Sequence, residues 1–162
     1  ELKKELKSSL LKDSNISWQR NDHHHLTVYF VGDMEPEQIS EMNEALAEVN
    51  LQYFSNVIEI TDISFFPNED SQVLAALVRS SPQINSLHKE VENIVVNIGL
   101  GTDLKAYKPH ITLGRFKEKK RPQYELEILE EPLKGKIKQI GVFESEFNKG
   151  KTDYILLRSF DF

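Results

Sequence analysis

Two stretches of this chain, HLTVYFVG at residues 25–32 and HITLGRF at residues 110–116, begin with the same pattern, His-x-Thr-x with x apolar. Both stretches are rich in apolar and β-branched residues, which predicts a strand in each case. Side chains alternate between the two faces of a strand, so the histidine and the threonine of each motif should lie on the same face. Their apolar neighbours should lie on the opposite face.

Two such strands facing each other would place two imidazoles and two hydroxyls around one small anion. Imidazole titrates near neutral pH, so a pair of histidines can supply one general base and one general acid, with a bell-shaped pH dependence. Threonine hydroxyls can donate hydrogen bonds to the non-bridging oxygens of a phosphate ester. The motifs therefore indicate His25 and His110 as catalytic residues and Thr27 and Thr112 as substrate-binding residues.

The composition is typical of a soluble globular protein, with 162 residues of which 39% are apolar and 28% charged. We treat residues 1–162 as a single bilobal domain. No apolar run approaches the length of about 20 residues that crosses a bilayer, and no signal peptide is expected. Cysteine is absent, which excludes disulfides and thiol catalysis and favours a cytoplasmic location.

The net charge of −6 argues against broad electrostatic binding of nucleic acid. Residues 105–121 are an exception, because seven basic residues and one acidic residue give this stretch a local charge of +6. The stretch surrounds the second motif, so it could attract a ligand that bears a phosphate. Lys117–Arg121, taken alone, could equally be a solvated turn.

The hydrophobic pattern predicts helices at residues 1–12, 36–49 and 82–98. It predicts strands at residues 16–20, 24–31, 57–66, 73–79, 109–116, 135–147 and 154–160. The charged connector after Phe116 could contain a short helix or a short strand. Each half combines a long helix, a His-x-Thr strand and a pair of strands. This indicates a weak internal repeat and an α+β fold of two lobes facing each other across a cleft.

Three consecutive histidines at residues 23–25 raise the alternative of a metal site. Successive strand residues face opposite ways, so all three cannot reach one ion, and we expect no metal ligands there. His23 and His24 are expected to face solvent or lie at a sheet edge. His88 is expected to be a structural residue at the boundary of a helix's apolar stripe.

Three further positions near the motifs remain ambiguous from the sequence. Tyr107 comes three residues before His110, and its ring could stack on a base, close the cleft, or pack in the core or its rim. Arg115 comes five residues after His110, which strict alternation places on the opposite face unless a bulge intervenes. Phe65-Phe66-Pro67 is expected to be core and turn rather than a ligand platform.

The sequence resembles the 2H phosphoesterase superfamily, whose members carry two His-x-Thr/Ser-x motifs. Within it, the likeness is to the LigT-like RNA 2′,3′-cyclic phosphodiesterases, also called 2′-5′ RNA ligases. Residues 25–32 resemble the first motif with its trailing apolar strand and glycine, and residues 107–115 resemble the second with its aromatic residue, proline and arginine. Residues 141–145, GVFES, are similar to a late strand of the family, so the likeness spans nearly the whole chain.

The resemblance implies a two-lobed LigT-like fold, with two antiparallel sheets facing across a central cleft and helices on the outside. It implies that His25 is the acid and His110 the base, and that no metal or other cofactor is needed. It also implies that the phosphate is held by Thr27 and Thr112 with the help of Arg115, and we expect Tyr107 to be a further substrate-binding residue. Family members usually begin with a strand before the first helix, which we expect to lie outside this numbering.

The expected reaction is hydrolysis of a 2′,3′-cyclic phosphate at an RNA 3′ end to a 2′-phosphate, and its reversal would join RNA ends. One alternative is a phosphodiesterase acting on another small cyclic or 2′-5′-linked nucleotide. Another is a non-catalytic module that binds RNA ends or nucleotides. The expected partner is an RNA 3′ end or a small cyclic nucleotide, with no membrane, no obligate protein partner and a monomeric chain.

Overall fold

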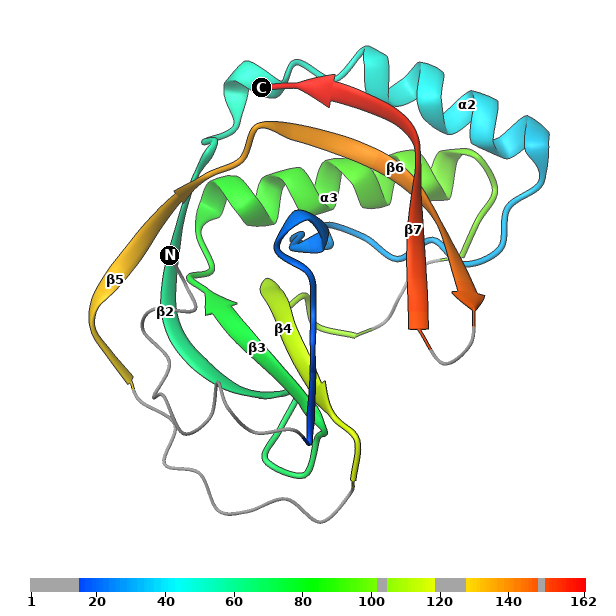
Figure 1. Ribbon diagram of the computed structural model, residues 1–162. Helices are drawn as coiled ribbons and strands as arrows, with labels where there is room; N and C mark the ends of the chain where they lie inside the picture. The colour runs from blue at the N-terminus through cyan, green and yellow to red at the C-terminus, as the bar shows by residue number, and fades with distance from the viewer. Residues whose placement is uncertain (1–14, 102–104, 119–127, 149–150) are drawn as a thin grey trace. The chain divides into compact units, whose positions relative to one another are not determined.

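The computed structural model describes residues 15–101, 105–118, 128–148 and 151–162 (Figure 1). The chain forms two compact units, and each unit combines three separate stretches of sequence. The first unit contains the residues up to Thr27, Ile58–Arg79 and Lys108–Gly135, and the second contains Val28–Val57, Ser80–Tyr107 and Lys136–Phe162. The units therefore alternate along the chain, whereas the weak repeat had suggested one lobe for each half.

The first unit is built on a five-stranded sheet in the order β1-β4-β3-β2-β5. Its strands are β1 Ile16–Trp18, β2 Val57–Phe66, β3 Val73–Val78, β4 His110–Phe116 and β5 Ile128–Lys136. The pairs β1–β4, β4–β3 and β3–β2 are antiparallel. Strand β4, which begins with the second motif, is thus hydrogen-bonded on both sides, and this fixes its position in the sheet.

The interior of this sheet is apolar and closely packed around β3 and β4. Leu74, Ala75, Ala76 and Leu113 have no exposed surface, and Phe116 is 1% exposed. Burying a leucine or phenylalanine side chain stabilises a fold by about 1.5–3 kcal/mol. The second motif therefore belongs to one of the most firmly held segments of the unit.

The second unit contains the helices α2 Pro36–Ala47 and α3 Pro82–Asn97 and the antiparallel strand pair β6 Gln139–Asn148 and β7 Lys151–Asp161 (Figure 1). Buried side chains from both helices form one cluster, and partly buried residues of the strand pair pack against it. The cluster is Met42, Leu46, Val91, Ile94 and Val95, and the strand residues are Ile140, Val142 and Phe160.

Both helices begin and end where the sequence predicts, within two residues. Each has a proline in its first turn, where the missing N–H costs nothing. The Ser81 hydroxyl accepts a hydrogen bond of 3.2 Å from the backbone N–H of Ile84 and so caps α3. Gly99, with φ +83°, lies just after α3, where the left-handed backbone conformation favours glycine.

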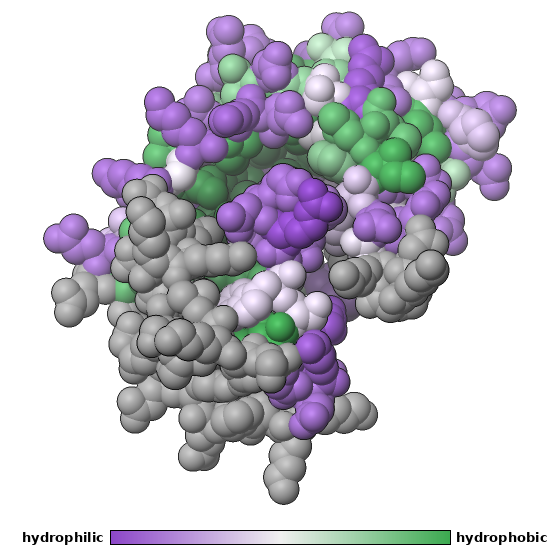
Figure 2. All heavy atoms as spheres, in the orientation of Figure 1, coloured by the Kyte–Doolittle hydropathy of each residue, from purple (hydrophilic) through white to green (hydrophobic). Residues whose placement is uncertain are grey.

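Apolar side chains also reach the surface of the strand pair. Figure 2 shows an apolar patch on the surface over β6 and β7. Ile155, Leu156 and Leu157 are 41–45% exposed on consecutive positions of β7, so apolar residues occupy both faces of this strand. Within the described ranges, no helix has both the length and the apolar character that crossing a membrane requires.

The prediction of a strand at residues 24–31 is wrong. Only Leu26 forms a bridge there, and Asn21–His23 form the short 3-10 helix η2. The apolar residues that suggested a strand, Val28, Tyr29 and Val31, instead pack against the helical cluster of the second unit. Tertiary packing thus overrides the local strand preference of this stretch.

The predicted strand at residues 135–147 is also divided differently. β5 ends at Lys136 and β6 begins at Gln139, and between them the backbone N–H of Ile137 donates to the carbonyl of Asn56 at 2.7 Å. The part of the charged connector that the structure describes contributes most of β5. The predicted helix at residues 1–12 lies outside the described residues.

Candidate active site

The second motif occupies the first positions of the interior strand β4. Ile111 and Leu113 are buried, with 8% and 0% of their surface exposed. His110 and Thr112 alternate with them and are half-buried. The predicted alternation is therefore confirmed for this motif, because its polar side chains share the face opposite the buried ones.

The first motif lies beside β4 although it is not part of a regular strand. Leu26 forms an isolated antiparallel bridge with Ile111. In an antiparallel arrangement the next facing pairs along the two chains are His25 with Thr112 and Thr27 with His110. Both motifs belong to the first unit, so the structure brings together four candidate residues that the sequence separates by up to 87 positions.

The two motif histidines are held in the same way, each by a backbone carbonyl two residues earlier. Nδ1 of His25 lies 2.9 Å from the carbonyl oxygen of His23, and Nδ1 of His110 lies 2.9 Å from that of Lys108. A carbonyl only accepts, so Nδ1 carries the proton and donates in both cases. Nε2 is then the nitrogen that can exchange a proton with a substrate, as acid or as base.

His110 has a further contact that the sequence did not predict. Its ring stacks on Phe66, with 3.6 Å between the centroids and 19° between the planes. Phe66, expected to be core or turn, is therefore a neighbour of the candidate catalytic residue. Burial, and to a smaller extent the nearby charge of His25, lower the pKa of His110 from its ordinary value of 6.5, although the bond to the Lys108 carbonyl acts in the opposite direction.

Arg115 lies on the same face as His110, because β4 contains a bulge. In the pairing of β4 with β3, the partners of His110, Thr112 and Arg115 are Leu77, Ala75 and Val73. Between the partners Ala75 and Leu74 the register shifts, and Leu113 is the additional residue in β4. The extra residue in β4 reverses the alternation beyond Thr112. The bulge that strict alternation required is thus present, and Arg115 is exposed on the face of the motif.

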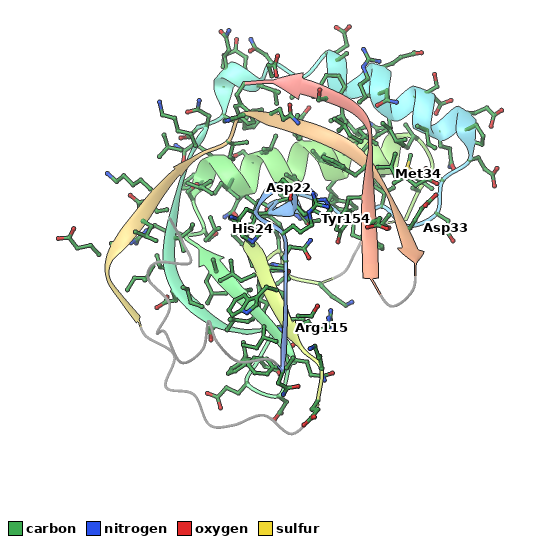
Figure 3. All side chains as sticks on the ribbon, viewed as in Figure 1. Asp22, His24, Asp33, Met34, Arg115 and Tyr154 are labelled. Atoms are coloured by element: carbon green, nitrogen blue, oxygen red, sulfur yellow. The ribbon has the colours of Figure 1, made fainter. Side chains whose placement is uncertain are left out.

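The histidines before the first motif are not gathered around a common point for a metal ion. Figure 3 shows His24 and Asp22 on the segment around η2 and Arg115 on β4. His23 and His24 are both half-buried, so the expectation of solvent-facing side chains is only partly met. Among the residues that the structure describes, no three His, Asp or Glu side chains are placed to share an ion.

Asp22 has a different role, as the ion-pair partner of Arg20. Arg20 Nε donates to Asp22 Oδ1 at 3.1 Å, and Arg20 Nη2 lies 2.5 Å from Oδ2. The hydrogen bond from Arg20 lowers the pKa of the Asp22 carboxyl. The pair is exposed, so it contributes little stability.

Tyr107, the aromatic residue before the second motif, belongs to the second unit and stacks on His88. Their ring centroids are 4.1 Å apart and the planes differ by 4°. Burial raises the pKa of Tyr107 to about 12, so the phenol is neutral at physiological pH. His88 was expected to be a boundary residue of α3, and nothing in the sequence pointed to its ring contacts.

The basic stretch around the second motif is only partly described. Lys105, Lys108, Arg115 and Lys117 are exposed. The remaining basic residues, 119–121, lie outside the described part of the chain. The exposed cations nearest to the second motif in sequence can therefore meet a ligand from solvent.

The first unit thus carries the two His-x-Thr motifs side by side, at the interior strand of a five-stranded sheet, and these are the motifs by which the sequence resembles a 2H phosphoesterase. The chain belongs to the 2′-5′ RNA ligase superfamily, whose family model matches residues 4–147. The resemblance seen in the motifs is thereby confirmed.

Two relatives carry the name RNA 2′,3′-cyclic phosphodiesterase. The protein of Archaeoglobus fulgidus is 31% identical over 96 residues, covering 59% of this chain and 53% of the relative. The protein of Aeropyrum pernix is 26% identical over 99 residues, covering 60% of this chain and 55% of the relative. The chain thus spans about half the length of these curated relatives.

Solved structures show the same fold over most of the chain. The structure of TT0787 of Thermus thermophilus has a TM-score of 0.77 and 20% identity, covering 91% of this chain and 82% of that one. Escherichia coli LigT complexed with 3′-AMP has a TM-score of 0.69 and 16% identity, covering 91% of this chain and 81% of that one. The predicted α+β fold with two antiparallel sheets is confirmed.

Proposed function

We propose that this protein hydrolyses 2′,3′-cyclic phosphate ends of RNA to 2′-phosphates by acid–base catalysis with two histidines. The observation that carries the proposal is the Leu26–Ile111 bridge, which sets the two motifs side by side within one unit. The matched bonds at Nδ1, which assign proton transfer to Nε2 in both histidines, support it further. The names of the relatives agree with this reaction.

In the proposed reaction His110 is the general base and His25 the general acid. Nε2 of His110 takes a proton from water as the water oxygen bonds to phosphorus. Nε2–H of His25 gives its proton to the 3′ oxygen as the bond from phosphorus to that oxygen breaks. The product carries a 2′-phosphate and a 3′-hydroxyl, and solvent restores the starting protonation of both imidazoles.

The assignment of His110 as the base is supported by its surroundings. The base must be neutral to accept a proton, and the lowered pKa of His110 keeps its imidazole neutral at pH 7. The ring of Phe66 covers one face of this imidazole, whereas the lone pair of Nε2 lies in the ring plane, so the stack does not cover it. Activity is expected to fall as the pH drops through a value below 6.5, where His110 becomes protonated.

Thr27, Thr112 and Arg115 are the proposed donors to the non-bridging phosphate oxygens. Thr112 and Arg115 share a face of β4 with His110, and Thr27 follows the bridge residue of the first motif. Charge develops on these oxygens in the transition state, so hydrogen bonds from hydroxyl and guanidinium groups are strongest there. Tyr107 belongs to the second unit and stacks on His88, and its contact with substrate stays a prediction from the sequence.

A nucleoside 2′,3′-cyclic monophosphate, assayed in the presence of EDTA, tests the proposal. We expect a 2′-phosphate product, and a loss of on the order of 10²–10⁴ in kcat/KM for His25→Ala and for His110→Ala. Glu41→Ala, on an exposed position of α2, serves as the control and should keep full activity.

A short RNA with a 2′,3′-cyclic phosphate end belongs in the same assay, because it separates an RNA-end enzyme from one that acts on small nucleotides. Turnover of the RNA with a lower KM than the mononucleotide would support an RNA-end substrate. Turnover of neither, with tight binding of both, would overturn the catalytic proposal in favour of a binding module.

A further inference from the structure

His88 on α3 is not part of the proposed reaction, yet it contacts two segments that lead to the motifs. Its Nδ1 lies 2.8 Å from the carbonyl oxygen of Val28, and because a carbonyl only accepts, Nδ1–H donates this bond. Val28 is the residue directly after Thr27. The hydrogen bond therefore ties the exit of the first motif to α3.

The ring of His88 makes the second connection. It stacks on Tyr107 with 4.1 Å between centroids and 4° between planes, a nearly parallel arrangement. Tyr107 directly precedes Lys108, whose carbonyl holds Nδ1 of His110. A second stack, on Tyr29 at 5.4 Å and 26°, strengthens the contact with the segment after the first motif.

The two segments are also the points at which the chain passes between its compact units. The second unit begins at Val28 and one of its stretches ends at Tyr107. Val28 and Tyr107 are 79 positions apart in sequence, yet a single side chain contacts both. A constraint on these residues passes through the covalent chain to Thr27 on one side and to Lys108 on the other.

We propose that His88 is a positioning residue that anchors the segment leaving the first motif and the segment entering the second motif to one helix. This inference rests on the proposed function for its effect on catalysis. Histidine suits the role because it combines a flat ring with an N–H at the ring edge. Phenylalanine would keep the stack but lose the donor, and asparagine would keep a donor but lose the ring.

Steady-state kinetics of three variants test the proposal. For His88→Ala we expect kcat to fall by about 10- to 100-fold with a smaller change in KM, because misplacing reacting groups by about 1 Å costs up to about 10²-fold. His88→Asn and His88→Phe should each recover part of this loss. The proposal is overturned if His88→Ala stays within about twofold of the wild type, or if neither conservative variant recovers activity.

A control of matched stability separates positioning from a general loss of folding. Val91→Ala removes buried volume from the same helix, in the cluster against which Val28 and Tyr29 pack, but it keeps the His88 ring and its N–H, and with them the bond to Val28 and the stack on Tyr107. At a temperature where circular dichroism shows all variants folded, Val91→Ala should keep the wild-type kcat even if its Tm falls as far as that of His88→Ala. Equal losses of kcat at equal Tm would mean that His88 is only structural.

Side-chain NMR tests the inference even if the wild type turns over no cyclic phosphate. The five histidines can be assigned by single substitution. We expect the ring signals of His25 and His110 to shift in His88→Ala and to stay in place in Val91→Ala. Unshifted signals would overturn the positioning role, whereas shifted signals with an inactive wild type would overturn the proposed function alone.

Discussion

The two motif histidines have equivalent places in the sequence, and the structure shows how each ring is held. Both donate from Nδ1 to a carbonyl two residues earlier. His110 also stacks on Phe66, and burial lowers its pKa. A lowered pKa suits the proposed base, because a general base must be unprotonated to accept a proton.

At the residue scale, we predict that His25→Gln raises the pKa of His110. The positive charge of His25 is one cause of the lowered value, so a neutral side chain of similar size removes that repulsion. The measurement is an NMR titration of the His110 ring in both proteins, where the wild-type midpoint should lie below 6.5. Lys89→Gln removes a charge from the exposed side of α3 and should leave the midpoint unchanged. A midpoint that falls or stays constant in His25→Gln would contradict the electrostatic argument.

At the scale of elements, the bulge in β4 decides which side chains accompany the second motif. It turns Arg115 to the face of His110, and the residue after the bulge, Gly114, faces β1 closely. A Cβ atom at position 114 would lie 3.0 Å from Cγ2 of Ile16 and 3.1 Å from the carbonyl oxygen of Ser17. Glycine therefore permits the close pairing of β1 and β4 beside the bulge.

We accordingly predict that Gly114→Ala lowers the free energy of unfolding by about 1–3 kcal/mol, the usual cost of forcing extra volume into a packed site. Urea denaturation monitored by circular dichroism provides the measurement. Gly101→Ala is the matched control, since a Cβ there meets nothing within 4 Å, and its change should stay within about 0.5 kcal/mol. Equal effects at both positions would show that packing against β1 is unimportant.

At the scale of the whole molecule, charge sets the kind of nucleic acid contact that the protein can make. The net charge is −6, while exposed cations follow the second motif at Arg115 and Lys117. A molecule of this kind attracts a terminal phosphate locally and repels an extended polyanion elsewhere. The proposed substrate is therefore an RNA end or a small nucleotide rather than a long RNA track.

The salt dependence of binding tests this view. With one or two phosphates neutralised, the slope of log K against log salt should be about −0.7 to −1.4 for a single strand. Fluorescence anisotropy with a short 2′-phosphorylated RNA of 5 to 15 nucleotides, roughly the site size of single-strand binders, measures the slope. Equal slopes for all lengths are expected, and a slope that steepens with length would indicate an extended binding track instead.

Local pattern was sufficient for most elements of the fold. The apolar periodicity and the prolines correctly predicted α2 and α3, and the runs of β-branched residues correctly predicted β2, β3 and β4. Alternation along β4 correctly predicted that His110 and Thr112 share one face, because Ile111 and Leu113 on the opposite face are buried in the core. These features depend on short-range sequence, because the spacing of apolar residues along the chain matches the period of a helix or of a strand.

Tertiary structure alone decided the rest. Residues 24–31 have a strand-like pattern, yet they divide between a bridge to Ile111 and packing against the helices, since long-range burial outweighs local preference. The stack of Phe66 on His110 and the contacts of His88 join residues distant in sequence, so no local pattern could reveal them. The sequence by itself determined which residue types could do the chemistry, and the fold determined how each is held, because pairing, stacking and burial depend on neighbours that only the folded chain supplies.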